Sequence, residues 1–346
     1  MSLHSSDPPD RPVRYGLIGP GSHAHEQLLP ALATLEGAEL AAIAARTPHN
    51  AARAATRWRA GAYVDHWTEL ADTAVVDAVL VAASPDLHAE ILAHCLPRGI
   101  SVFVEKPPAP DTDTLRRLVD VEQSAPEGVV AFVGFNFPYG SSYTKLRAAL
   151  APHGELRSVD VRMVSAKPAV PVRHEATVLD SLLEGLGTHA VDMVVRELGM
   201  PDEVHAHAAH IGGHRISVRI TMVHRDGRLG TVHIGNHSNR LEYRCEQVTE
   251  QGAVGILDQH NSVQVSLPAS SARQHLVDAK EVVRYDWPSR RGGYDRTGYS
   301  RELESFHQSV RDRLPSTSTL MSCLNTYLVL DRARDQLKSQ PCGAAR

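Results

Sequence analysis

Three short segments of this chain hold residue types that bind phosphate or polarise a reacting oxygen. The first is a turn between Gly19 and Gly21, which follows the apolar run Val13–Ile18 and precedes a helical pattern that begins with Ser22 and His23. Glycines let the backbone approach a pyrophosphate, and the first N–H groups of a helix face it with the positive end of the helix dipole. Strand, glycine turn and helix together predict a dinucleotide site.

The second segment, Arg46 and Thr47, comes after the next apolar run, Leu40–Ala44. NAD-selective domains of this class place an Asp or Glu at this point, where its carboxylate binds the ribose 2′-hydroxyl. No acid is present here. An arginine can instead pair with a 2′-phosphate and stack on adenine, and a threonine hydroxyl can donate to the phosphate. The segment therefore predicts NADP(H) as the cofactor, with NAD(H) as the alternative.

The third segment is Lys106, which follows the apolar strand Ser101–Val104 and Glu105 and precedes Pro107. A residue at the carboxyl end of a central parallel strand points into the crevice where such sheets bind ligands. Because proline restricts the residue before it to extended backbone, the direction of the ammonium group is fixed. We expect Lys106 to act on the reacting group rather than to be a solvated surface lysine.

These residues need a scaffold, and the first half of the chain alternates apolar strands with helices. The expected elements are strands over Leu40–Ala44, Val76–Ala83, Ser101–Val104 and Val129–Phe135, and helices over Pro48–Trp58, Leu87–Leu96 and Thr112–Gln123. Buried strands separated by helices predict βαβ units with right-handed crossovers. We therefore predict an α/β fold in which residues 12–137 form a Rossmann domain, a doubly wound parallel sheet, after a disordered lead-in over residues 1–11.

The second half changes to period-two alternation, which is typical of half-exposed antiparallel strands. The expected elements are strands over Ser158–Val164, Val204–Ile211, Ile216–Val223 and Leu229–Ile234, and helices over Ser142–Leu150, Val178–Leu198, Ser300–Asp312 and Leu320–Leu337. We predict a C-terminal α+β domain over residues 138–346 with an open, mostly antiparallel sheet. An uncovered sheet face usually finds a partner, so we expect self-association as a dimer or tetramer.

Composition limits the classes of molecule that this protein is expected to bind. The net charge is −4, from 36 basic and 40 acidic residues, and no block of like charge favours nucleic acid or a membrane surface. No apolar run approaches the roughly 18 residues that span a bilayer. Four scattered cysteines fit a reduced, cytoplasmic protein. His205 and His207 share one strand face, but no cysteine or carboxylate pattern accompanies them, so we expect no metal.

The chain resembles the Gfo/Idh/MocA family, the group of glucose–fructose oxidoreductase and inositol dehydrogenase. The matching residues are Gly19-Pro20-Gly21, Ser84-Pro85-Asp86-Leu87-His88, Glu105-Lys106-Pro107, Gly134-Phe135-Asn136, and Gly187-Thr188-His189 with Asp192. The resemblance implies hydride transfer between a nicotinamide cofactor and a carbonyl or alcohol, commonly of a sugar or cyclitol. It also implies that Lys106 contacts substrate and cofactor, that its bond to Pro107 is often cis, and that Ser84, His88 and Glu105 belong to the cofactor groove.

The resemblance breaks at one catalytic position. Hydride transfer to a ketone develops an alkoxide, and His189 is suited to donate the proton. Members of the family carry an aspartate four residues before this histidine, where this chain has Gly185. Glu184 is adjacent, but one helical residue turns its side chain by about 100°. It replaces the aspartate only if the backbone shifts; otherwise it is a solvated or structural carboxylate.

The substrate is a polar small molecule, with a sugar as the first expectation. Asn136 and Tyr139 are candidate substrate contacts beside His189, and Pro138 stands where the family often has arginine. We expect Lys106 and His189 to serve together as the catalytic residues. Two alternatives stay open: reduction of a C=N bond on the same fold, and a non-catalytic regulator that binds the dinucleotide.

Overall fold

The computed structural model describes residues 11–172, 175–267, 282–286 and 293–339. The chain divides into two units, residues 1–134 with 299–321 and residues 135–298 with 322–346. The division expected from the sequence places residues 299–321 with the second domain, whereas they pack with the first. Of the expected lead-in, residues 1–10 lie outside the described residues, and Arg11 forms an ion pair with Asp77 at 3.0 Å.

The first unit contains a six-stranded, wholly parallel sheet in the order β3-β2-β1-β4-β5-β6. Its strands are β1 Val13–Ile18, β2 Ala38–Ala44, β3 Ala62–Val64, β4 Ala78–Val81, β5 Ser101–Glu105 and β6 Ala131–Gly134. The order reverses direction beside β1, the point at which Rossmann sheets bind dinucleotides. The predicted doubly wound parallel sheet is therefore confirmed.

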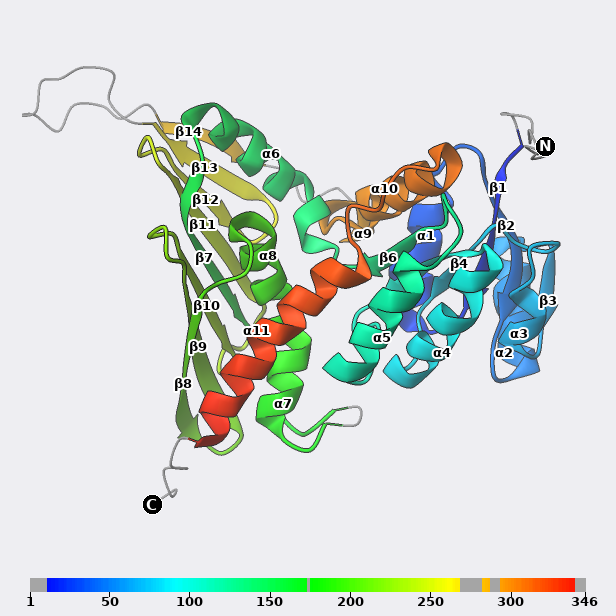
Figure 1. Ribbon diagram of the computed structural model, residues 1–346, viewed down its shortest axis with the longest axis horizontal. Coiled ribbons are helices and arrows are strands. Elements are labelled where there is room, and N and C mark those ends of the chain that lie inside the picture. Colours follow the sequence, from blue (N-terminus) through cyan, green and yellow to red (C-terminus); the bar gives the residue numbers. More distant parts are fainter. Residues whose placement is uncertain (1–10, 173–174, 268–281, 287–292, 340–346) are drawn as a thin grey trace, which may run out of the picture. The chain divides into compact units, whose positions relative to one another are not determined.

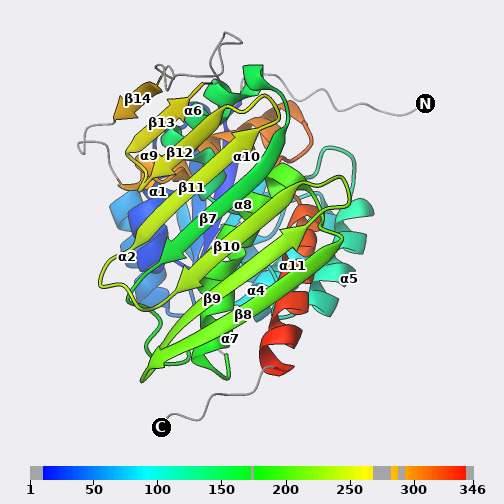
Figure 2. The same ribbon diagram turned by 90° about the vertical axis from the view of Figure 1, so that its left-hand side faces the viewer.

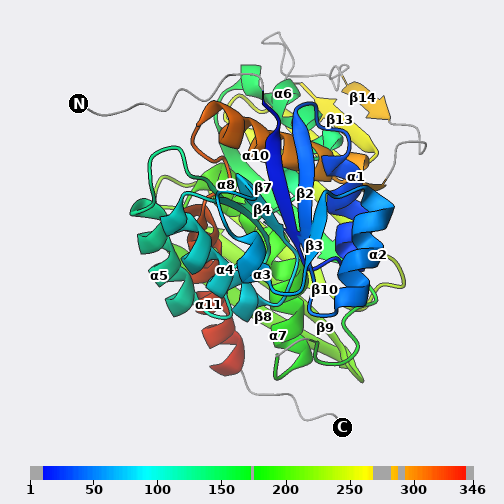
Figure 3. The same cartoon turned by 90° about the vertical axis from the view of Figure 1, so that its right-hand side faces the viewer.

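Helices cover both faces of this sheet, with α1 and α2 on one side and α4 and α5 on the other (Figure 3). The helices are α1 Leu29–Leu32, α2 Pro48–Trp58, α3 Trp67–Leu70, α4 Pro85–Cys95, α5 Thr112–Gln123 and α10 Tyr299–Asp312. A π-helical turn, Ala24–Leu28, precedes α1 where one regular helix is predicted. The short elements β3 and α3 are not predicted, because three or four residues carry too little periodicity.

The late helix α10 joins the first unit through its apolar side. Phe306 is fully buried and contacts Tyr15, Phe103 and Phe132, with ring centroids 5.8–6.1 Å apart. The Tyr15 hydroxyl lies 2.9 Å from Nδ1 of His307. These contacts with residues of β1, β5 and β6 explain why residues 299–321 belong to a unit that begins some 300 residues earlier.

The second unit contains an eight-stranded sheet in the order β14-β13-β12-β11-β7-β10-β9-β8, antiparallel except between β10 and β7 (Figure 2). Its strands are β7 Leu156–Val164, β8 Glu203–Gly212, β9 Arg215–Val223, β10 Leu229–Gly235, β11 Glu242–Thr249, β12 Val254–Asp258, β13 Ser262–Ser266 and β14 Val282–Asp286. The predicted open, mostly antiparallel sheet is confirmed, although β11–β14 are not among the predicted strands.

Helices lie against one face of this large sheet (Figure 1). They are α6 Ser141–Leu150, α7 Val178–Leu182, α8 Thr188–Leu198 and α11 Leu320–Ser339, and the short helix α9 Gly293–Arg296 lies beside α6. Alternate residues of the strands, such as Val161, Ile220 and Val232, form a core with buried residues of α8 and α11. In Figure 2, no helix of the described chain lies over the opposite face. A second π-helical turn, Leu183–Gly187, separates α7 from α8 within the helix predicted over 178–198.

Candidate active site

A cavity of about 600 Å³ lies beside the carboxyl ends of β1, β2 and β4. Five of the predicted cofactor residues line it: Gly19, Gly21, Arg46, Thr47 and Ser84. These residues come from three different strand–helix connections. The sheet therefore brings the predicted phosphate turn and the predicted 2′-phosphate residues to one space.

The two glycines of the turn have different structural roles. Gly19 has φ +88°, and a Cβ on it would lie 2.4 Å from the carbonyl oxygen of Ala82, so no larger residue fits. Gly21 has no such strain, and a Cβ on it would meet no atom within 4 Å. Its missing side chain thus leaves open space at the cavity, as a phosphate cradle requires. This turn fits the pyrophosphate of a dinucleotide.

The far part of the cavity is lined by Asp65, His66 and Trp67 next to Arg46 and Thr47. The side chain of Thr47 makes no capping bond at the start of α2, although Thr47 occupies the N-cap position. No sequence pattern indicated Asp65, His66 and Trp67, because they follow β3 and begin α3, the two short elements that periodicity does not resolve. The rings of His66 and Trp67 can pack against a base, and Asp65 adds a carboxylate to this end of the cavity.

His23 contacts Glu105 rather than the cavity. Its Nε2 lies 2.7 Å from Oε1 of Glu105, and its ring packs edge-on against Tyr299 at 5.3 Å. Burial alone would lower the pKa of His23, but the hydrogen bond and the charge of Glu105 raise it overall. The pair ties the glycine turn after β1 to the end of β5, next to Lys106. Tyr299 lies too far along the sequence for local motifs to indicate it.

His88 is buried and forms hydrogen bonds to the backbone on either side of it, including the residue after Lys106. The backbone N–H of Ala83 donates to its Nε2 at 2.9 Å, so its Nδ1 carries the proton and donates to the carbonyl oxygen of Pro107 at 2.7 Å. The peptide bond between Lys106 and Pro107 is cis, as the resemblance implies. With 1% of its surface exposed, His88 holds the turn that carries Lys106 instead of presenting a polar atom to the groove.

The second unit carries the remaining predicted residues. The ring of His189, at the start of α8, packs edge-on against Phe135 at 6.0 Å and in a tilted arrangement against Phe137 at 4.8 Å. Asn136 is 4% exposed, and its Nδ2 donates to the carbonyl oxygen of Thr297 at 2.8 Å. The segment Phe135 to Tyr139 thus lies beside His189 within this unit.

Asp192 has a structural role. It is 2% exposed and forms an ion pair at 3.3 Å with Arg196, one turn further along α8. This agrees with the interpretation that Asp192 pairs with a neighbour on its own helix. Burial raises the pKa of Asp192, against the opposing effect of the Arg196 charge.

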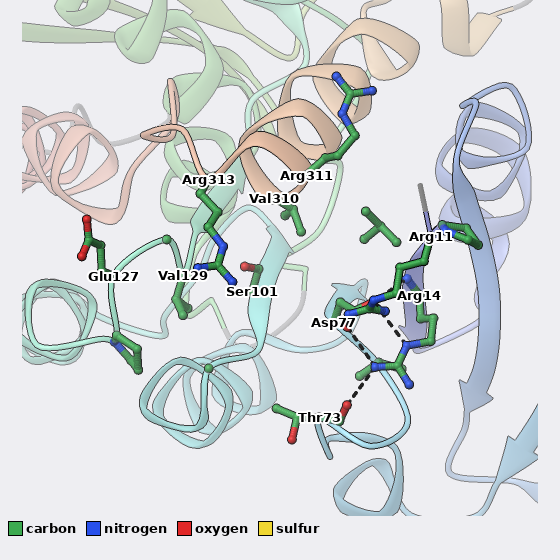
Figure 4. Close-up of a pocket in the computed structure, with 16 residues that line it drawn as sticks. Arg11, Arg14, Thr73, Asp77, Ser101, Glu127, Val129, Val310, Arg311 and Arg313 are labelled. Carbon is green, nitrogen blue, oxygen red and sulfur yellow. Dashed lines mark hydrogen bonds and ion pairs between the residues drawn. The ribbon is translucent and has the colours of Figure 1, made fainter. Parts of the chain in front are cut away.

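A second cavity of about 620 Å³ lies at the opposite, amino-terminal end of the parallel sheet. Figure 4 shows Arg11 and Arg14 converging on Asp77, at 3.0 and 2.9 Å. Arg311, at the same cavity, pairs with Asp312 at 2.8 Å. Because these guanidinium groups already have carboxylate partners, we do not place the cofactor there.

Within the described part of the chain, no group of three or more His, Cys, Asp or Glu residues is arranged to hold a metal ion. His205 forms an exposed pair with Glu203 at 3.1 Å. Among the same residues, no helix has the length and apolar character needed to cross a bilayer.

Comparison with known proteins agrees with this geometry. Residues 13–135 match the model of the Gfo/Idh/MocA oxidoreductase family, described as having an NAD-binding Rossmann fold. Residues 13–135, about the first third of the chain, are therefore similar to the dinucleotide-binding domain of this family. The match covers β1 to β6, including the glycine turn and Lys106, which the resemblance noted from the sequence had indicated.

Individual proteins are similar to this chain over different shares of its length. An oxidoreductase of Rhizobium meliloti is 34% identical over 31% of this chain, and the alignment spans only 32% of that relative's length. Inositol 2-dehydrogenase of Burkholderia multivorans is 25% identical over 96% of this chain and 95% of its own length. A dehydrogenase structure from Chromobacterium violaceum superposes with a TM-score of 0.86 at 24% identity, covering 95% of this chain and 96% of that one.

Proposed function

We propose that this protein is an NADP(H)-dependent oxidoreductase that interconverts an alcohol and a carbonyl on a sugar or sugar-like small molecule. The observation that carries the proposal is the shared cavity, in which the open space at Gly21 lies near Arg46 and Thr47. The choice of NADP(H) rests on these two side chains and on the absence of an acid at the end of β2. The near-full-length likeness to an inositol dehydrogenase supports a polyol substrate.

The proposed roles follow from the chemistry of two side chains. When bound, the nicotinamide cofactor supplies or accepts the hydride. Lys106 places a positive charge where negative charge develops on the reacting oxygen. His189 gives a proton to that oxygen in reduction and takes it back in oxidation. His88 and the pair of His23 with Glu105 position the segment that carries Lys106.

Substrate recognition is proposed for the segment before α6 in the second unit. Tyr139 offers a hydroxyl group and an aromatic face. Because Nδ2 of Asn136 is committed to Thr297, Asn136 would contact a substrate through its amide oxygen. His189 would add a contact to the reacting group itself.

The deciding experiment combines binding with turnover. Fluorescence titration should give a lower Kd for NADPH than for NADH, by about tenfold or more, because a 2′-phosphate gains charge-assisted hydrogen bonds worth about 1.5–3 kcal/mol. Oxidation of inositol and a panel of sugars is then followed at 340 nm with each cofactor. Tight dinucleotide binding without turnover of any polyol, ketone or imine would favour the non-catalytic regulator. Turnover of imines alone would favour the C=N reductase.

We also propose a dimer or tetramer in which a second copy covers the open face of the large sheet. That face carries Arg219, Arg244 and Glu246, half-buried or exposed, and the short pair of Arg162 with Glu242 at 2.9 Å. Light scattering at micromolar concentration should report a dimer or tetramer; a monomer would overturn this assembly. The free buried thiols of the described cysteines support our proposal of a reducing, cytoplasmic compartment.

A further inference from the structure

The helix that leads to His189 contains one extra residue in a single turn. Between α7 and α8, residues Leu183–Gly187 form a π-helical turn, in which the N–H of Thr188 donates to the carbonyl oxygen of Leu183, five residues earlier. An α-helix makes this bond over four residues. The π turn therefore shifts every residue before it by about one position relative to those after it.

This shift changes which side chain lies above His189. Five residues along an α-helix rotate by about 500°, which would put Glu184 about 140° away from His189. In a turn of roughly 4.4 residues, five residues rotate by about 410°, and the difference falls to roughly 50°. Glu184 therefore turns toward the helix face of His189. The backbone shift that would let Glu184 replace the missing aspartate is present in the structure.

Glu184 is also withdrawn from solvent. Its exposed fraction is 8%, so the alternative of a solvated carboxylate is wrong. Glu184 shares a hydrogen bond with the carboxyl group of Glu175; burial raises the pKa of Glu175, and the Glu184 charge raises it further. Asp180 pairs with Arg334 at 3.3 Å in the same cluster.

The position of the family's aspartate is itself open. A Cβ added at Gly185 would meet no atom within 4 Å. The aromatic rings of Phe135 and Phe137 pack against His189 and limit the rotation of its imidazole. Gly185 has no side chain to orient that imidazole from its own helix, and Glu184 is the neighbouring acid that the π-helical turn moves toward the face of His189.

We propose that Glu184 is the positioning residue of His189, brought to the place of the family's aspartate by the π-helical turn. The inference rests on the proposed function. In reduction, the N–H bond of the imidazolium breaks, its electron pair stays on the ring nitrogen, and the proton forms an O–H bond with the alkoxide. Glu184 accepts a hydrogen bond from the other ring N–H, which fixes the orientation of the ring and stabilises its charged form.

The test moves the carboxylate from position 184 to position 185. Glu184→Ala should lower kcat for inositol oxidation by about tenfold to a hundredfold, with KM changed less than threefold. The double variant Glu184→Ala with Gly185→Asp restores the acid one residue along and should recover most of the lost kcat. Glu184→Gln keeps the shape of the side chain and should behave as Glu184→Ala does. Unchanged kcat in both single variants would overturn the inference.

A second readout does not depend on turnover. In full-length protein carrying ¹³C-labelled histidine, with His189→Ala used to assign the signal, Glu184→Gln should move the titration of His189 to lower pH by about one unit. Glu175, Asp180 and Arg334 remain in place as the other charges of the cluster. The acid limb of the kcat profile should move in the same direction.

A matched control comes from the exposed pair of Glu203 with His205, at 3.1 Å. Glu203→Gln removes an exposed carboxylate and should leave both kcat and the His189 signal unchanged, because water screens a surface pair. If the His189 titration shifts but no substrate turns over, the proposed function fails while the pairing stands. If turnover is present and neither the titration nor kcat responds to Glu184, the pairing fails alone.

Discussion

The first unit forms its candidate site largely from backbone, whereas the second unit forms its own from side chains on one helix. At the cofactor cavity, Gly19 closes the turn and Gly21 leaves space, and neither contributes a functional group. At His189, the proposed proton transfer depends on the angle at which the carboxylate of Glu184 faces the imidazole. A glycine turn tolerates variation in the residues around it, but a helical pair depends on the length of every turn between its members.

The two π-helical turns sharpen this contrast. Ala24–Leu28 follows Gly19, Pro20 and Gly21, so the extra residue leaves the spacing within this part of the cavity lining intact. Leu183–Gly187 contains Glu184 and ends two residues before His189, so it changes the angle between these two side chains directly. The same backbone irregularity is thus neutral for the glycine turn, whereas the proposed pairing of Glu184 with His189 depends on it.

The largest effect should come from a side chain of the first unit. Lys106→Met should lower kcat/KM by about 10²–10⁴-fold, because the charge that stabilises the reacting oxygen is lost. NADPH affinity should stay within a few-fold, as measured by fluorescence titration. Lys167→Met is the matched control, since this exposed lysine also precedes a cis proline. Near-normal turnover in folded Lys106→Met would show that the site of the first unit works through its backbone alone.

The two glycines should separate binding from folding. Gly21→Ala should weaken NADPH binding by about tenfold or more without lowering Tm, because its Cβ enters the open space that the phosphate needs. Gly19→Ala should instead lower Tm, since it adds strain at φ +88° and a clash with Ala82. Gly37→Ala, at φ +73° with nothing within 4 Å, measures the strain without the clash. Equal effects on binding and stability at Gly21 would contradict a phosphate cradle.

Arg46 tests whether side chains add specificity to the backbone cradle. Arg46→Ala should raise the Kd for NADPH by about tenfold while changing the Kd for NADH by less than threefold. Arg53→Ala, an exposed arginine further along α2, should change neither. If NADH binds more tightly than NADPH to the unaltered protein, Asp65 rather than Arg46 sets the cofactor preference.

The smallest effect concerns stability at the amino-terminal end of the sheet. Burial would raise the pKa of Asp77, but hydrogen bonds from Arg14 and Arg11 outweigh it and lower the value from 3.8 to about 2. A pKa lowered in the folded state stabilises the fold above about pH 4 by roughly 2 kcal/mol, and this is lost as the pH falls toward 2.

Asp77→Asn should therefore lower Tm at pH 7 and leave a smaller difference from the unaltered protein near pH 2. Thermal unfolding followed by circular dichroism across this range measures both. Asp113→Asn, which removes an exposed ion pair with Arg116, should change Tm little at any pH. A Tm loss at Asp77 that does not depend on pH would mean that packing, not charge, holds this cavity together.

The sequence predicted those parts of the site that depend on strand ends. Gly19 and Arg46 each follow an apolar strand, and parallel strands bring their carboxyl ends to one edge, so the sequence pattern located them, whereas Ser84 was implied by the family resemblance. His88 was expected along the cofactor groove, yet both of its ring nitrogens bond to backbone groups. Such a role depends on contacts between distant segments, which no local pattern reveals.

The spacing of apolar residues could not predict the π-helical turn at Leu183–Gly187, for another reason. One extra residue in a turn changes hydrogen bonding but not the apolar pattern enough to break a helix prediction. The absent aspartate at Gly185 was the available signal, and it raised the question of Glu184 without answering it. Departures from a family motif are therefore best examined together with the helix geometry around them.

The return of α10 to the first unit has a consequence for how this protein can be divided or recombined. A gene fragment that stops at residue 134 encodes all six strands of the parallel sheet but lacks Phe306. The aromatic rings of Tyr15, Phe103 and Phe132 would lose a buried neighbour, and such a fragment should aggregate. Exchanging cofactor modules between relatives would thus require two crossovers, one on each side of the interposed second unit.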